Sequence, residues 1–262
     1  MSGAGAELAK VVAYLDTYLR IREVPDDSNA LNGLQVENSG TVRRIVAAVD
    51  ASQATFDGLG SSGGPPLLLV HHGMFWDGNQ PVVGRRYRRL HALLAFDAAV
   101  YAAHIPLDLH PEVGNNAILA RRLGLTDLVP FGTHKGVAIG LAGKAPTELG
   151  TRTGLVNRLA AILKIPSNSI RLIPGGTETV LRIGVITGGA GSAIAQAQAA
   201  GCDAYVTGEG AAHTYFDAME LGLNVLYAGH YATETIGVQA LAAHLAERFG
   251  LPWEFHDHPT GM

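Results

Sequence analysis

A single cysteine, Cys202, occurs among the 262 residues of this chain. It cannot form an internal disulfide, and such sparse use is typical of a reducing compartment, so we expect a cytoplasmic protein. The sequence also shows no secretory signal and no run of 18 apolar residues, which argues against a membrane protein. Charged residues make up only 16%, with a net charge of −4. This balance argues against a nucleic-acid partner or an anionic membrane surface.

Apolar residues, in contrast, make up 47% of the chain, enough for a sizeable core. Apolar runs typical of strands alternate with helical patterns of about 10–15 residues, which predicts an α/β fold with mixed sheets covered by helices. We expect two similar lobes, residues 1–128 and 129–262, with a C-terminal helix over residues 234–249 that packs back on the first lobe. The segment Val24 to Asn38 is rich in Pro, Asp and Asn and predicts a loop.

A pair of histidines follows one of the apolar runs. PPLLLV, Pro65 to Val70, ends in His71, His72 and Gly73. A short apolar run bounded by Gly and Pro predicts a buried strand, and its carboxyl end is where open α/β sheets place ligand sites. Adjacent residues of a strand point to opposite faces, so both imidazoles can serve one site only if the strand has already broken into a turn at this pair. We therefore expect a turn here, and Gly73 permits it.

Two further pairs combine imidazole and carboxylate. His230 and Glu234 lie four residues apart after a strand-like stretch. In a helix that begins near His230, this spacing stacks the two side chains on one face, where they could bind one metal ion or bridge two. His104 and Asp108 have the same spacing after another apolar stretch, but Pro106 predicts a loop there.

These pairs belong to an internal repeat of one α/β unit. Arg43 to Ser52 resembles Leu181 to Ala190, since each is an apolar strand that runs into a turn of small residues. LLLVHHG then aligns with AYVTGEG, and VYAAHIPLD aligns with LYAGHYATE. Two facing copies would place their ligands in a shared cleft between the lobes. The alignment matches His72 with Glu209, His104 with His230, and Asp108 with Glu234.

Five segments, in order, resemble the GTP cyclohydrolase I type 2 homologue family, whose members are also described as Nif-three-like dinuclear metal proteins. They are NGLQVEN, LLLVHHGMFW, AAHIPLDLHPEVGNNAILARRLGL, GCDAYVTGE and NVLYAGHYATET. The resemblance implies the Nif-three-like fold, in a short form without the domain that many relatives insert in the middle. It also implies a homo-oligomer, a toroidal hexamer. It implies two divalent metal ions per chain, held by His71, His72, Asp108, His230 and Glu234.

The predicted ligands indicate a class of chemistry. Imidazoles and carboxylates suit Zn, Fe or Mn, and five side chains cannot saturate two cations, so metal-assisted hydrolysis is the reaction class implied. The family label suggests GTP, a small-molecule nucleotide, as the substrate. A phosphoester or a cyclic amide is equally compatible with these ligands. The other hypothesis is a non-catalytic metal-binding ring with a regulatory or scaffold role.

For proton transfer we predict Glu209, His213 and His104. The repeat places His104 and Glu209 after strands, and Glu209 and His213 lie four apart at a predicted helix start. Each could act as a general acid or base, or orient a ligand; the alternative is a hydrogen-bonded lining residue without catalytic duty. Gly188 to Ser192 could be a tight turn or a phosphate-binding turn, and the former is favoured.

Overall fold

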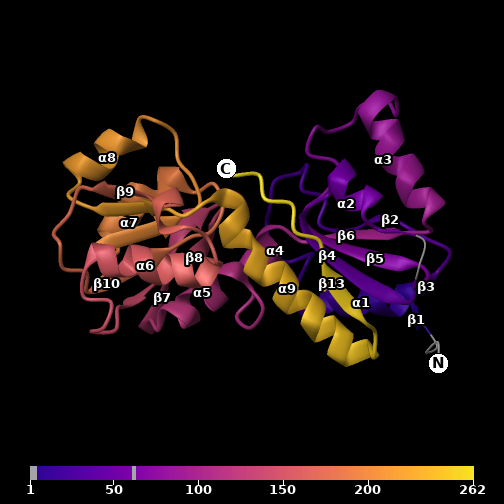
Figure 1. Ribbon diagram of the computed structural model, residues 1–262, viewed down its shortest axis with the longest axis horizontal. Coiled ribbons are helices and arrows are strands. Elements are labelled where there is room, and N and C mark those ends of the chain that lie inside the picture. Colours follow the sequence, from indigo (N-terminus) through magenta and orange to yellow (C-terminus); the bar gives the residue numbers. More distant parts are fainter. Residues whose placement is uncertain (1–4, 61–62) are drawn as a thin grey trace. The chain divides into compact units, whose positions relative to one another are not determined.

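The computed structural model describes residues 5–60 and 63–262, which fold as two compact units. Unit 1 contains the chain up to Leu107 together with Gly237–His258, and unit 2 contains Asp108–Ile236 with Pro259–Met262. Each unit is an α/β structure with a mixed sheet covered by helices, as the sequence predicts (Figure 1). The predicted lobe boundary at residues 128–129 falls inside a strand of unit 2, and the units divide at Leu107 instead.

Unit 1 is built on a five-stranded sheet in the order β13-β4-β5-β6-β2. The first four of these strands are parallel, and β2 pairs antiparallel with β6 at the edge. The strands of this sheet are β2 (Gly33–Val36), β4 (Arg44–Asp50), β5 (Pro66–His72), β6 (Ala99–Ala102) and β13 (Trp253–Phe255). Two further strands, β1 (Ala6–Glu7) and β3 (Thr41–Val42), pair with each other in a separate two-stranded sheet. The helices are α1 (Leu8–Tyr18), α2 (Gln53–Asp57), α3 (Gly84–Ala95) and most of α9 (His230–Phe249); α4 (Ile105–Asp108) ends at the boundary with unit 2.

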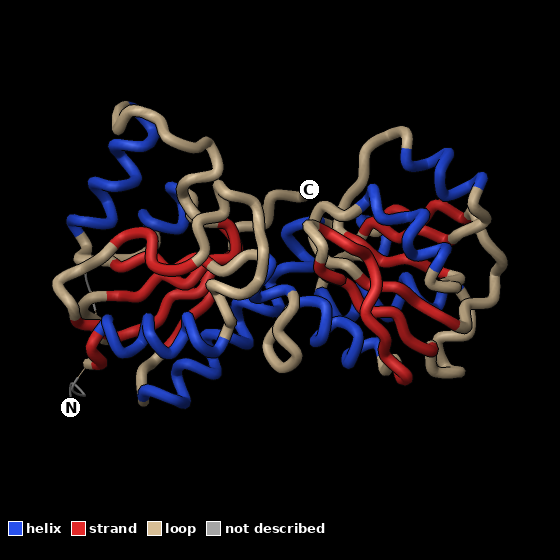
Figure 2. The backbone as a smooth tube through the Cα atoms, turned by 180° about the vertical axis from the view of Figure 1, so that it is seen from behind, coloured by secondary structure: helices blue, strands red, loops and turns tan. Residues whose placement is uncertain are grey.

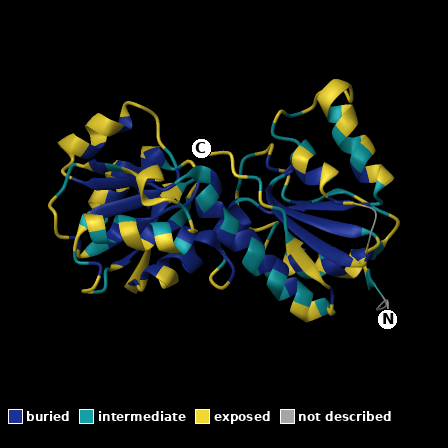
Figure 3. Cartoon of the chain, viewed as in Figure 1, coloured by how far each residue is buried: buried dark blue, intermediate teal, exposed yellow. Residues whose placement is uncertain are grey.

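Both faces of this sheet are buried, which explains why its strands are apolar throughout rather than alternating. On one face, side chains such as Val46 and Leu68 pack with Phe56 of α2 and Leu93 of α3. On the other face, the buried Tyr101 donates a hydrogen bond to Asp16 of α1 over 2.9 Å. Figure 3 shows the buried strands beside α3, which exposes most of its surface.

Unit 2 is built on a six-stranded sheet in the order β7-β8-β10-β11-β12-β9. Its strands β10, β11 and β12 are parallel, and β8 and β9 flank them in the antiparallel sense. Figure 2 shows the strands of each unit in red among the blue helices. The strands are β7 (Thr126–His134), β8 (Val137–Lys144), β9 (Arg171–Pro174), β10 (Arg182–Val185), β11 (Ala204–Thr207) and β12 (Asn224–Tyr227). The helices are α5 (Asn115–Leu123), α6 (Arg152–Leu163), α7 (Ile194–Ala199), α8 (Thr214–Glu220) and the 3-10 turns η1 (Ser167–Ser169) and η2 (Gly191–Ala193).

The two sheets share one arrangement at their centres. The parallel strands β4-β5-β6 and β10-β11-β12 each follow the chain in the same order. Their positions in sequence are those of the predicted repeat, so the structure confirms that repeat. The carboxyl ends of parallel strands meet at one edge of a sheet, and the residues that follow these strands therefore gather within each unit.

Two local predictions differ from the structure. The loop predicted over Val24 to Asn38 contains β2, an edge strand that its partner β6 holds in place despite weak strand propensity. The loop predicted around Pro106 is the short helix α4, because proline in the first turn of a helix removes no hydrogen bond. Among the helices of residues 5–60 and 63–262, none is both long and apolar enough to cross a membrane.

Candidate metal-binding clusters

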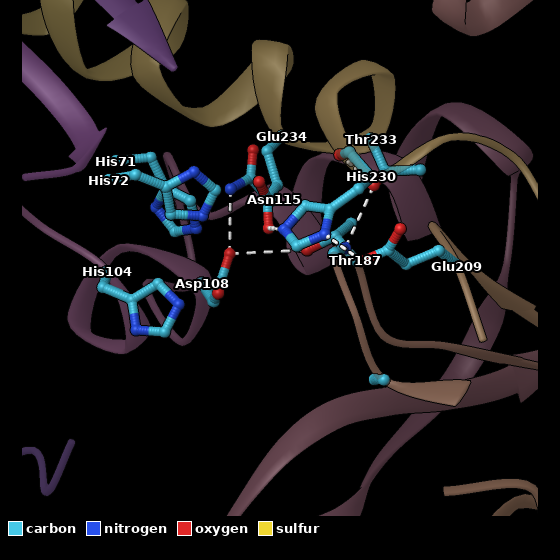
Figure 4. Close-up of polar contacts among 12 residues, drawn as sticks. His71, His72, His104, Asp108, Asn115, Thr187, Glu209, His230, Thr233 and Glu234 are labelled. Atoms are coloured by element: carbon cyan, nitrogen blue, oxygen red, sulfur yellow. Dashed lines mark hydrogen bonds and ion pairs between the residues drawn. The ribbon is translucent and has the colours of Figure 1, made fainter. Parts of the chain in front are cut away.

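Three histidines of unit 1 form one cluster at the carboxyl ends of β5 and β6. His71 and His72 are the last two residues of β5. The strand therefore continues through both histidines, in contrast to the predicted turn. His104 follows β6 by two residues. The ring centroids are 4.8 Å apart for His71 and His72, 5.0 Å for His71 and His104, and 5.7 Å for His72 and His104 (Figure 4). One ring nitrogen from each lies within 4.8 Å of the others, a grouping that could hold a metal ion.

Each ring in this cluster uses Nδ1 for a hydrogen bond to an oxygen. The acceptors are the Ala103 carbonyl for His71 at 2.8 Å, Asp50 Oδ1 for His72 at 2.9 Å, and Asp26 Oδ1 for His104 at 2.9 Å. Carbonyl and carboxylate oxygens accept hydrogen bonds, so Nδ1 carries the proton in each ring. Nε2 is then the nitrogen with a lone pair for a metal ion, which is how metal-binding histidines are commonly held.

In unit 2, His230 and Glu234 occupy the first turn and a half of α9, which begins at His230 as predicted. His230 Nε2 lies 3.2 Å from Glu234 Oε1, and His230 Nδ1 lies 2.9 Å from Glu209 Oε1. The Glu234 side chain is only 3% exposed. The Nδ1 atom of this ring therefore lies against a carboxylate, as it does in His72 and His104 of unit 1, and its Nε2 lies beside Glu234.

The two carboxylates also control the charge of His230. Burial alone lowers the pKa of this imidazole, but the hydrogen bonds and negative charges of Glu234 and Glu209 outweigh burial and raise the pKa to about 9. His230 is therefore protonated at neutral pH when no metal ion is bound. A cation that binds at Nε2 takes the place of that proton.

Asp108 is the remaining predicted ligand and belongs to unit 2. Its buried carboxylate accepts a hydrogen bond from Asn115 Nδ2 at 2.8 Å and a longer one, 3.4 Å, from Thr187 Oγ1 (Figure 4). The next residue, Gly188, donates its N–H to Thr233 Oγ1 at 3.0 Å. The turn at residues 187–188 thus contacts the Asp108 carboxylate and the first turn of α9.

Gly188 makes this turn possible. Its φ angle of +72° lies in the left-handed region that favours glycine. A Cβ atom there would lie 2.2 Å from Glu234 Oε1. The segment Gly188 to Ser192 is therefore the tight turn that the sequence predicts, and it lets the backbone approach a candidate metal ligand closely.

Glu209 and His213 differ in their surroundings. His213 is the N-cap residue of α8, which begins at Thr214, so it lies at the predicted helix start, whereas Glu209 lies four residues earlier, outside the helix. Glu209 contacts His230 and lines a pocket of about 270 Å³ with Arg171, Tyr215, Tyr227 and Met262. His213 is exposed and is not among the residues that line this pocket.

The sequence predictions missed the residues that hold the predicted ligands. Asp50 could have been found, because it ends β4 just as His72 ends the neighbouring β5. Asp26 lies in the segment predicted as a loop, and its sequence position carries no signal of the contact with His104, 78 residues away. Asn115, Thr187 and Thr233 likewise act through tertiary contacts.

The fold and these clusters define a class of protein: a duplicated α/β protein with candidate metal-binding histidine and carboxylate groups. Residues 6–260 match the family model for Duf34/NIF3 (NGG1p interacting factor 3), so the chain belongs to that family.

Relatives match over nearly the whole chain. A "GTP cyclohydrolase 1 type 2 homolog" of Deinococcus radiodurans is 47% identical, covering 97% of this chain and 94% of that protein. One from Halobacterium salinarum is 42% identical, covering 98% and 100%. The crystal structure of TTHA1606 from Thermus thermophilus aligns with a TM-score of 0.86 at 44% identity, covering 98% of this chain and 100% of that one. The protein ybgI, of unknown function, aligns with a TM-score of 0.84 at 35% identity and the same coverage.

Proposed function

We propose that this protein is a metal-dependent hydrolase that binds two divalent ions per chain through His71, His72, Asp108, His230 and Glu234. The observation that carries the proposal is a shared hydrogen bond: His71, His72 and His230 each donate Nδ1–H to an oxygen acceptor. That arrangement keeps Nε2 for a metal ion. The buried carboxylates of Asp108 and Glu234 supply the negative charge that divalent ions need. This donor set fits Zn, Fe or Mn.

When bound, such ions activate water for hydrolysis near neutral pH. The chain's own residues then have separable tasks. Asp108 and Glu234, both buried, would supply carboxylate ligands, and Glu234 lies beside Nε2 of His230. Glu209 holds the Nδ1 proton of His230 and also faces the pocket, so it is the favoured group for moving a proton to or from a substrate. His213 stays a weaker candidate for that task, because it does not line the pocket.

The pocket in unit 2 supports a small-molecule substrate with an anionic group. The Arg171 guanidinium lines it, and among the residues that the structure describes it makes no side-chain hydrogen bond or ion pair. Tyr215 and Tyr227 offer ring surface, and Gly210 is required there because a Cβ would lie 2.4 Å from Tyr227 Oη. At about 270 Å³ the pocket suits a fragment rather than a whole triphosphate, since drug-sized ligands use about 300–1,000 Å³.

GTP is the first substrate to test, because the relatives carry the name "GTP cyclohydrolase 1 type 2 homolog". Metal-loaded protein is incubated with GTP, and released formate is measured, with Glu209→Gln as the variant and Asp217→Asn, an exposed α8 carboxylate of the same unit, as the matched control. The proposal expects turnover by wild type and D217N and a loss of about 10²–10⁴-fold in E209Q.

Two other outcomes are informative. Turnover of a phosphoester or a cyclic amide but not of GTP would keep the hydrolase and replace the substrate. A protein that binds metal and hydrolyses none of these would contradict the hydrolase and favour a non-catalytic metal-binding ring with a regulatory or scaffold role. The proposed assembly, a toroidal hexamer, is tested separately by sedimentation velocity, where a monomer or dimer at micromolar concentration would contradict it.

A further inference from the structure

We propose that His104 is itself a metal ligand, which completes a three-imidazole site with His71 and His72, and that Asp26 is the residue that positions it. The sequence prediction gives His104 a role in proton transfer instead. The new inference rests on the proposed function in one respect: it takes from it that the protein binds a divalent ion, and it does not depend on hydrolysis. Its evidence lies entirely within unit 1.

The first observation is that His104 lies about as close to His71 as His72 does. Its centroid is 5.0 Å from that of His71, nearly the 4.8 Å that separates His71 from His72. The three candidate ligand nitrogens lie within 4.8 Å of one another. In a tetrahedral site with bonds of about 2.1 Å, two ligand nitrogens are roughly 3.4 Å apart. A decrease of at most about 1.4 Å in each nitrogen–nitrogen distance would therefore bring all three nitrogens onto one ion.

The second observation is the way in which Asp26 holds the ring. Its carboxylate lies 2.9 and 3.1 Å from His104 Nδ1 and also accepts hydrogen bonds from the Asn32 amide at 2.8 Å and the Ile105 N–H at 3.0 Å. Asn32 Oδ1 in turn accepts the backbone N–H of His104 at 2.7 Å. The Asp26 side chain is 5% exposed. Ring and backbone of His104 are thus fixed by the same two residues.

The hydrogen bonds around Asp26 indicate which nitrogen of His104 carries the proton. The Asp26 carboxylate accepts from the Asn32 amide and from the Ile105 N–H, and a carboxylate oxygen accepts from a ring N–H in the same way. Nδ1 of His104 is therefore the donor, and Nε2 is the ring nitrogen with a lone pair for coordination.

The third observation is the packing that limits rotation of the ring. The indole of Trp76 meets His104 edge to face, with centroids 4.9 Å apart, and meets His72 at 6.2 Å. The exposed fraction of the His104 side chain is 18%, close to the 19% of His72. The hydrogen bonds and this packing together hold the ring in one orientation, which is how metal-binding histidines are held.

The test measures metal affinity and coordination rather than activity. Metal-free protein is titrated with Co²⁺ in competition with a chromophoric chelator, and the visible absorption of the bound Co²⁺ is recorded. The variants are His104→Ala and Asp26→Asn. The matched controls are His91→Ala and Asp57→Asn, which change exposed residues of unit 1 outside the cluster. Circular dichroism and thermal melting of each metal-free variant verify that it is folded.

The proposal expects D26N to weaken Co²⁺ binding about 10–100-fold and H104A to weaken it more, with an altered absorption spectrum in H104A and wild-type behaviour in both controls. A folded H104A with wild-type affinity and spectrum would overturn the assignment of His104 while leaving the proposed hydrolase intact. A wild-type protein that binds no Co²⁺ would overturn both. Loss of GTP turnover in H104A with unchanged Co²⁺ binding would instead assign His104 to proton transfer.

Discussion

At the scale of single residues, the clusters are organised by hydrogen bonds to the Nδ1 atoms. In His72, His104 and His230 the Nδ1–H group donates a hydrogen bond to a carboxylate, and in His71 it donates to a backbone carbonyl. Neutral imidazole binds a metal ion through one nitrogen, so the partner of the other nitrogen selects the tautomer and fixes the ring. The candidate ligands are therefore set in place by residues such as Asp26, Asp50 and Glu209, which need not touch the ion.

Substitutions at Glu234 and His213 distinguish a predicted metal ligand from a residue that does not bind the metal. Glu234→Gln keeps the size of the side chain but removes its charge, so we expect most of the metal to be lost in the purified protein. His213→Ala changes an exposed loop residue, and we expect its metal content to equal that of wild type. Elemental analysis of both variants checks this, and equal loss from the two would contradict the division of roles.

The raised pKa of His230 predicts how metal binding depends on pH. Below a pKa of about 9 the metal-free imidazole is charged, and a metal ion must displace that proton. Affinity for Zn²⁺ or Co²⁺ should therefore rise between about pH 7.5 and 9, by up to about tenfold per pH unit for one released proton. Competition titrations at several pH values measure the slope. Glu209→Gln removes one of the charges that raise the pKa, so its slope should be smaller, and a flat wild-type profile would refute the account.

At the scale of elements, the sequence predicts what is local and misses what is tertiary. The repeat, the strand β5 and the start of α9 at His230 follow from apolar patterns and spacing, and the structure confirms them. The edge strand β2 and the one-turn helix α4 were missed, because a neighbouring strand stabilises the former and the latter is too short to show a period. The contact of Asp26 with His104 has no sequence signal, since it joins two segments only after folding.

The turn after β10 provides a test at this scale. Gly188→Ala and Gly201→Ala both place alanine at a φ of +72°, which costs about 1–2 kcal/mol of stability in each. Only at Gly188 does the new Cβ meet Glu234 Oε1, since nothing lies within 4 Å at Gly201. We expect the unfavourable backbone conformation to lower the stability of both variants by a similar amount. The contact with Glu234 should lower the stability of G188A further, and only G188A should lose bound metal.

Metal content and thermal unfolding of the two variants measure this difference. If G188A keeps its metal, or if G201A loses as much, the approach of the turn to Glu234 does not support metal binding.

At the scale of the whole molecule, two units repeat one arrangement of three parallel strands, and each unit gathers its own candidate ligands at the carboxyl ends of those strands. The family relation covers the same extent, since the match spans residues 6–260 and the relatives align over nearly their full length. A duplicated unit that keeps imidazoles and carboxylates at equivalent positions is most simply explained by a shared task for these groups. Binding of metal ions is the task that their chemistry supports.

The most direct test of that claim is the metal content per chain of protein purified without chelators, measured by inductively coupled plasma mass spectrometry. We expect about two divalent ions per chain, retained through gel filtration and removed by chelation. Less than a small fraction of one ion per chain, with no uptake when Zn²⁺, Fe²⁺ or Mn²⁺ is supplied, would contradict it.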